Sequence, residues 1–72
     1  MRIEFSFKRN GEVIERTFEC GTIRQGIRRL RDYIYDQQDI NKEDWVIGYV
    51  YEDDICLGEI NYYGNFIKKD GV

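Results

Sequence analysis

The chain contains no histidine and a single serine among its 72 residues. The lack of histidine removes imidazole acid–base catalysis and the usual zinc ligand. Ser6 lies inside an alternating segment, with no neighbouring base to activate it as a nucleophile. The seven glycines are scattered, so they form no glycine-rich phosphate-binding loop. The sequence therefore predicts a protein that is not an enzyme and that uses no cofactor.

Long hydrophobic runs are also missing, because no segment approaches the length needed to span a bilayer. Residues 1–5 do not resemble a signal peptide, so we expect a cytoplasmic protein. Cys20 and Cys56 lack a metal-ligand spacing and are predicted to be reduced thiols, with a disulfide as the alternative. The acidic run 52–54 resembles a solvated turn more than a cation site, so no metal is predicted.

Composition and charge describe a single folded domain with an uneven charge distribution. The content of hydrophobic residues is 42%, and eleven residues are aromatic, which favours a globule over a disordered chain. Residues 1–31 hold eight basic and four acidic residues (+4), and residues 32–72 hold three basic and ten acidic residues (−7), which gives the net −3. We expect one domain over residues 1–72, with a frayed tail at 68–72.

The N-terminal segment 1–20 is predicted to form a β-hairpin. Polar and apolar residues alternate along residues 2–8, and Asn10-Gly11 favours a type I′ turn. A two-residue loop pairs Phe7 with Ile14 and Ile3 with Phe18. The same register places Arg16 opposite Phe5, among apolar residues. Three explanations are open: Arg16 extends from a sheet edge, a bulge turns it outward, or its charge is functional.

Residues 22–38 are predicted to form the one long helix. Ile23, Ile27, Leu30 and Ile34 recur on one face, and Thr22 with Gln25 resembles a capping box. Gly26 lies beside this apolar stripe, which indicates a close approach to the sheet. The helix carries its arginines in the first half and its aspartates towards the end, against the preference of the helix dipole.

Residues 45–67 are predicted to form a second hairpin with a possible extra strand. Its first strand is apolar on both faces. A two-residue loop at Asp53-Asp54 gives four cross-strand pairs: Tyr51 with Cys56, Tyr49 with Gly58, Ile47 with Ile60, and Trp45 with Tyr62. We expect one set to face the helix and a second set to face away. The helix-facing set is Trp45, Ile47, Tyr49, Ile60 and Tyr51, and the outward set is Val46, Val50 and Leu57.

The order of elements predicts an α+β fold with two layers, in which antiparallel hairpins in the order ββαββ pack on one helix. If both hairpins share one sheet, the arrangement resembles a β-grasp, in which the first and last strands are parallel neighbours. One helix covers only one face of a sheet, so the second face should stay apolar and uncovered. Such patches mark interaction sites, although residues 66 and 67 could fold back as a lid.

The primary hypothesis is a non-enzymatic protein-binding module. Its specific form is an inhibitor, of the type that phages or mobile elements use against host defences, that docks on a basic, nucleic-acid-handling partner. The predicted surface combines acidic residues with aromatic ones: Asp32, Asp36, Asp39, Glu43, Asp44, Tyr35, Tyr49 and Tyr51.

Two alternatives come from other classes. In the first, the chain binds nucleic acid through arginines, which contact phosphates while a tyrosine ring stacks on a base. The residues for this role are Arg24, Arg28, Arg31 and Arg16. The acidic net charge argues against it. In the second alternative, the apolar face is buried in a structural homodimer.

Overall fold

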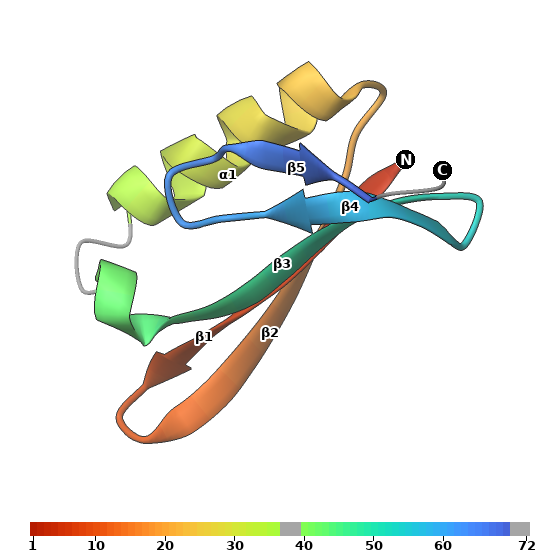
Figure 1. Cartoon of the computed structure of the whole chain (residues 1–72). Coiled ribbons are helices and arrows are strands. Elements are labelled where there is room, and N and C mark those ends of the chain that lie inside the picture. The colour runs from red at the N-terminus through yellow and green to blue at the C-terminus, as the bar shows by residue number, and fades with distance from the viewer. Residues whose placement is uncertain (37–39, 70–72) are drawn as a thin grey trace.

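The computed structural model describes residues 1–36 and 40–69, which form a two-layer α+β domain (Figure 1). Within these residues, five strands form one antiparallel sheet in the order β2-β1-β3-β4-β5. The long helix α1 crosses one face of the sheet. The predicted class and element order are confirmed. The elements are β1 (Arg2–Arg9), β2 (Glu12–Glu19), α1 (Ile23–Asp36), the short 3-10 helix η1 (Lys42–Asp44), β3 (Trp45–Glu52), β4 (Ile55–Ile60) and β5 (Phe66–Lys68).

The β1–β2 hairpin has the predicted register from Arg2–Glu19 to Arg9–Glu12 without a shift. Asn10 and Gly11 both adopt positive φ angles, 53° and 81°, as a type I′ turn requires. Arg16 lies on the outer strand β2, is exposed, and donates a hydrogen bond from Nη1 to the Glu15 carbonyl oxygen (2.9 Å). The regular register removes the explanation by a bulge, and the outer position of β2 is the one that extension from a sheet edge requires.

The strand order differs from the arrangement of a β-grasp. β1 pairs with β3, the strand after the helix, and the two run antiparallel. The last strand, β5, lies at the edge beyond β4. The composition of β3 explains this order, because a strand with apolar residues on both faces suits the middle of a sheet. The expected parallel pair of first and last strands is therefore wrong.

Two irregularities in the pairing decide which side chains of β3 face the helix. The register shifts between Val50 and Tyr51 against β4, so Val50 pairs with Gly58 and Tyr49 pairs with Glu59. The predicted pairing of Tyr49 with Gly58 is therefore wrong. A second shift lies between Ser6 and Phe7 where β1 meets β3. Each bulge adds one residue and reverses the faces of the residues beyond it.

As a result, the predicted helix-facing set is correct in part. Trp45 stacks on Phe5 of the core with ring centroids 5.6 Å apart, and Ile60 is buried as expected. Val50, predicted to face outward, is fully buried in the core, and Leu57 packs partly against it. Strand alternation then places Ile47, Tyr49 and Tyr51 on the face opposite the helix. Their predicted orientation is wrong because the pairing was assumed to be free of bulges.

The helix matches its prediction from Ile23 to Asp36, and the expected residues 37 and 38 lie outside the described residues. Thr22 Oγ1 accepts a hydrogen bond from the Gln25 main-chain nitrogen (3.2 Å), as a capping residue does. Gly26 is buried, and a Cβ atom there would overlap Ile3 Cδ1. The close approach to the sheet that Gly26 predicts is confirmed.

The core lies between α1 and the sheet, with Tyr33 of the helix against Phe5 and Phe18 of the first hairpin. In the described part of the chain, the fully or nearly fully buried apolar residues are Ile3, Phe5, Phe7, Leu30, Ile40, Val50 and Ile60. The possible extra strand exists as β5, which pairs with the edge of β4. Cys20 and Cys56 are free thiols. The expected frayed tail is wrong for residues 68 and 69, because Lys68 pairs with Gly58 and the Lys69 main-chain nitrogen donates a hydrogen bond to the Leu57 carbonyl oxygen (2.9 Å). Residues 70–72 lie outside the described residues.

The β3–β4 turn contains two aspartates with positive φ, 50° at Asp53 and 67° at Asp54. A residue with a Cβ atom is strained in this region, and the second turn position favours glycine. We expect Asp54→Gly to raise the free energy of unfolding by about 1 kcal/mol. Asp54→Asn, which removes the charge but keeps the side chain, should change it by less than about 0.5 kcal/mol. Urea denaturation measures both, and a loss of stability in Asp54→Gly would contradict the strain argument.

Candidate protein-binding face

The face of the sheet that points away from α1, called the open face below, is not covered by any element within residues 1–36 and 40–69 (Figure 1). Strand alternation and the register place on it the side chains Ile47, Tyr49, Tyr51, Cys56 and Ile67. Tyr49 and Tyr51 contact each other edge to face, with ring centroids 6.2 Å apart. Ile67 is 59% exposed. The alternative of a lid is wrong for residues 66 and 67, because β5 extends the sheet at its edge; residues 70–72 lie outside the described residues.

Hollows flank Tyr49 on both sides. One of about 410 Å³ lies towards β4 and β5 and is lined by Cys56, Glu59 and Ile67. The other, of about 250 Å³, lies towards β1 and β2 and is lined by Ser6, Thr17 and Ile47 among others. The Tyr49 ring therefore stands between two shallow depressions, and the face is contoured for contact with side chains of another molecule.

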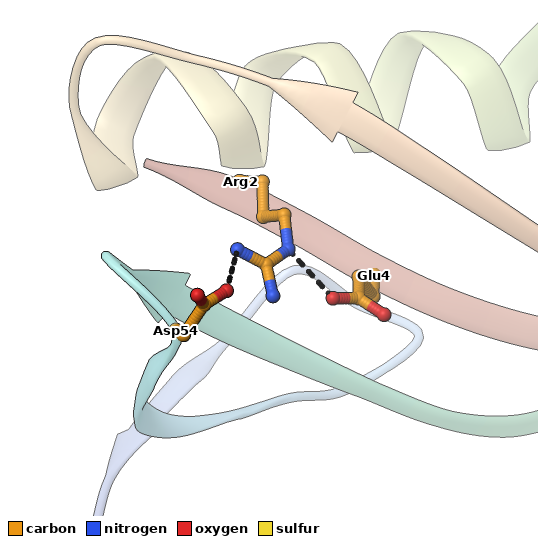
Figure 2. A network of polar contacts seen from close by, with 3 residues as sticks. All are labelled: Arg2, Glu4 and Asp54. Atoms are coloured by element: carbon orange, nitrogen blue, oxygen red, sulfur yellow. Dashed lines mark hydrogen bonds and ion pairs between the residues drawn. The ribbon is translucent and has the colours of Figure 1, made fainter.

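A polar network closes one end of the open face (Figure 2). Arg2 binds Glu4 through Nε (2.7 Å) and Asp54 of the β3–β4 turn through Nη1 (3.2 Å). Its guanidinium also lies over the Tyr51 ring, 4.6 Å from the centroid. The hydrogen bond to Glu4 raises the pKa of Arg2, so the group stays charged. Arg2 thus holds the turn and Tyr51 in place against β1.

Desolvation of the ring also affects Tyr51. This desolvation is the main cause that raises the pKa of the Tyr51 phenol, and Cys56, Glu4 and Tyr49 act in the same direction. Arg2 acts in the opposite direction. Tyr51 therefore remains a neutral hydroxyl at physiological pH, able to donate and accept hydrogen bonds.

Charged side chains of both signs surround the tyrosines. Tyr49 lies between Glu4 of β1 and Glu59 of β4 in the register, and the outer strand adds Glu15 and Glu19. Arg2, the cation nearest the tyrosines, is already paired with two carboxylates. Among the described residues, Glu15, Glu19 and Glu59 form no ion pair. Lys68 and Lys69 line the hollow on the β4–β5 side together with Glu59, and Arg16 lines the other hollow together with Glu4 and Glu15.

The structure does not bring the predicted acidic and aromatic residues onto one surface. Tyr49 and Tyr51 lie on the open face, whereas exposed Asp32, Tyr35 and Asp36 lie on α1, on the other side of the sheet. The remaining acidic residues of the predicted set are not all free. Glu43 is exposed on η1, Asp44 Oδ2 accepts a hydrogen bond from the Asn41 main-chain nitrogen (2.9 Å), and Asp39 lies outside the described residues.

Three of the four predicted phosphate-binding arginines lie together. Arg24, Arg28 and Arg31 line one hollow on the flank of α1. Arg31 Nε donates a hydrogen bond to the Tyr63 carbonyl oxygen (3.2 Å), which places this flank on the side of the β4–β5 connection. Arg16 is not part of this group, because it lies on β2. On that opposite side of the helix, Arg29 binds the Glu19 carbonyl oxygen (2.8 Å) and covers Phe18.

Sequence reasoning missed the contribution of Glu4, Glu59 and Ile67 to the open face. The bulge between β3 and β4 pairs Tyr49 with Glu59, and β5 then places Ile67 beside it. Leu57 is the extra residue of this bulge, and no turn or glycine marks it in the sequence. The sheet-edge position of Ile67 depends on β5, for which the only sign was the turn-forming pair Gly64-Asn65.

Comparison of the chain with protein-family models, curated proteins and solved structures finds no match. In the described part of the chain, no group of three or more histidine, cysteine or acidic side chains is placed to hold a metal ion. The described helices are also too short or too polar to cross a membrane. The function is therefore argued from the geometry of the chain itself.

Proposed function

We propose that this chain is a non-enzymatic protein-binding module that docks on a basic partner through the open face. The observation that carries the proposal is a set of side chains on the open face of a sheet whose other face is already filled by α1. Ile67 is exposed, and Ile47, Tyr49 and Tyr51 are partly exposed. Tyrosines bury a large area at low entropic cost, and they are enriched at the centres of interfaces. An apolar face of this kind is typical of an interaction site.

The carboxylates beside the tyrosines are the basis for the proposed class of partner. Glu15, Glu19 and Glu59 are unpaired within the described residues and border an aromatic centre. A complementary surface has apolar side chains at its centre and lysines or arginines around them. Proteins that handle nucleic acids carry basic surfaces of this kind. Docking there would compete with the nucleic acid, so the module would act as an inhibitor in the cytoplasm, of the anti-defence type.

Charge reversals at two exposed glutamates test the proposal. Glu59 lies on the open face, whereas Glu43 lies on η1 in the acidic segment that the sequence singled out. The immobilised full chain captures proteins from a lysate of its native host, and each captured protein is purified and measured by calorimetry. We expect Glu59→Lys to weaken binding of the true partner at least about tenfold, since charge reversal at an interface replaces attraction with repulsion. Glu43→Lys should leave it within about twofold.

A second variant, Tyr49→Thr, keeps a strand-forming residue and should weaken the same complex about thirtyfold, the loss expected for a hot-spot side chain. Circular dichroism confirms the fold of each variant. The proposal is supported if the captured protein has a basic surface and nucleic acid displaces the module. It is overturned if Glu43→Lys abolishes binding while Glu59→Lys does not. A Tyr49-dependent dimer in light scattering would also overturn it, because a second copy would then cover the face.

A further inference from the structure

A second surface, on the opposite side of the molecule, combines basic and aromatic side chains. Arg24, Arg28 and Arg31 project from one flank of α1 and line a hollow of about 640 Å³ with an apolar floor of Ile23 and Ile27. The guanidinium groups of Arg24 and Arg28 form no hydrogen bond or ion pair with residues 1–36 and 40–69. Asp32 is the one carboxylate in the lining, so the hollow is net positive.

The neighbouring hollow is aromatic and shares Arg31 with the first. It measures about 550 Å³, and its lining includes Tyr35, Tyr62 and Tyr63. Tyr35 is 79% exposed, so its ring is accessible to solvent, and Tyr63 is 53% exposed, with its ring in contact with that of Tyr62 (centroids 5.3 Å apart). Lys42 lies 5.8 Å from the centroid of the Tyr63 ring and adds a positive charge at the far side. Together the two hollows form a continuous path along the helix, called the arginine–tyrosine flank below.

We propose that the arginine–tyrosine flank binds single-stranded nucleic acid. The three arginines lie about one helical turn apart, roughly 4.5 to 6 Å along the helix axis, so they can contact successive phosphates of one strand. The exposed tyrosine rings lie next in line and can stack on bases. Arginines along a backbone track with stacking aromatics beside them are the features of single-strand binding. This inference goes beyond the proposed protein-binding role and uses different residues.

The observations favour a single strand over a duplex. In a duplex the bases are stacked on each other, so Tyr35 and Tyr63 would have no base face to contact. They also favour nucleic acid over an acidic protein segment, because an acidic peptide uses the arginines but gives the exposed rings no flat partner. The open-face carboxylates lie across the sheet, and screening limits their reach to about 8 to 10 Å. On the helix side, Asp32 and Asp36 of α1 are outnumbered by the three arginines of the flank, so the net charge of −3 does not oppose local binding.

Fluorescence anisotropy with the full chain tests the proposal. The probes are labelled oligothymidylate and oligouridylate of about 12 nucleotides, a length within the site sizes of single-strand binding proteins. Three phosphate contacts on a single strand give a log–log salt slope of about −2, so affinity should fall about 20-fold between 50 and 200 mM salt. Arg28→Glu should weaken binding at 50 mM salt at least about tenfold. Tyr35→Ala should weaken it about tenfold through lost stacking.

Arg16→Glu is the matched control for Arg28→Glu, because it changes the net charge equally at an exposed arginine outside the flank. It should change the affinity less than about twofold. Equal losses in the two variants would show a non-specific charge effect and overturn the proposal. Three other results would also overturn it. They are competition by poly-glutamate as strong as that by the oligonucleotide, full affinity in Tyr35→Ala, and tighter binding of a duplex than of the single strand.

The two surfaces can fail independently. Tyr49→Thr and Glu59→Lys should leave oligonucleotide binding within about twofold, and Arg28→Glu should leave binding of the protein partner unchanged. If open-face variants abolish oligonucleotide binding, the flank is not the site. That result would not decide the protein-binding proposal, which has its own test.

Discussion

Replacement of Leu30 by alanine is expected to lower the free energy of unfolding by about 2–5 kcal/mol. Leu30 is fully buried at the centre of the core between α1 and the sheet. Its loss leaves a cavity that the rigid sheet cannot fill by relaxing. A domain of 72 residues typically has only about 4–11 kcal/mol of total stability. The variant should therefore be close to unfolding at 37 °C, which urea denaturation followed by circular dichroism measures.

Ile55→Ala is the matched control for Leu30→Ala. It also shortens an aliphatic side chain, but Ile55 is 60% exposed at the start of β4. Its effect should stay below about 0.5–1 kcal/mol. If Leu30→Ala costs no more than Ile55→Ala, then α1 does not pack on the sheet as described. The open face would then have no structural basis, because it is defined as the side that the helix leaves free.

Gly58→Val is expected to detach β5 from the sheet. A Cβ atom at Gly58 would overlap the main-chain carbonyl oxygen of Ile67 and lie 2.9 Å from Phe66 Cε1. Because main-chain atoms cannot rotate away as the end of a side chain does, the two strands must separate. We expect a loss of about 1–3 kcal/mol. In hydrogen exchange, the Lys69 amide, which bonds the Leu57 carbonyl oxygen at 2.9 Å, should lose its protection.

Glu59→Val controls for the added valine. Glu59 is the next residue of β4, and its side chain is exposed on the open face. Valine fits the strand there, so stability should change by less than about 0.5 kcal/mol and the Lys69 amide should stay protected. Unchanged protection in Gly58→Val would contradict the pairing of β4 with β5. Ile67 could then not be counted on the open face.

The first hairpin and the helix could be predicted because their signals are local. Alternation along residues 2–8 and the Asn10-Gly11 turn are enough to define every pair of the β1–β2 register. The apolar stripe of α1 is likewise a property of neighbouring residues in the sequence. Gly26 indicates the close approach to Ile3, because only a residue without a side chain fits there. Arg16 had competing explanations in this hairpin, and the regular register on the outer strand removes the bulge from among them.

The orientation of β3 could not be predicted, because it depends on two bulges that arise from packing between distant strands. A strand that is apolar on both faces gives no preference to either orientation by pattern alone. Packing prefers Val50 and Gly48 on the helix side, because Ile60 and Trp45 fill the space above Gly48. The bulge opposite Val50 allows this arrangement and turns Tyr49 outward.

For the candidate site, the sequence predicted an uncovered apolar face and an arginine flank, and both exist as surfaces. It could not assign the acidic residues to the correct side. Asp32, Asp36 and Glu43 are close to Tyr35 in sequence, and they stay on the helix side in the structure. The carboxylates beside Tyr49, those of Glu4 and Glu59, come from strands far apart in the chain. The distribution of charge along the sequence therefore did not predict which carboxylates lie on the open face.

Hydroxyl-radical footprinting of the monomer, with its mass confirmed by light scattering, tests the central claim most directly. The account predicts that Tyr49 and Tyr51, which are partly exposed, react in the free protein at rates well above that of Phe7, which is fully buried in the core. Binding of the partner should then suppress the reaction at Tyr49 and Tyr51 but leave that at Tyr35 unchanged. If Tyr49 and Tyr51 are as unreactive as Phe7 in the isolated monomer, the open face is covered, which would contradict the account.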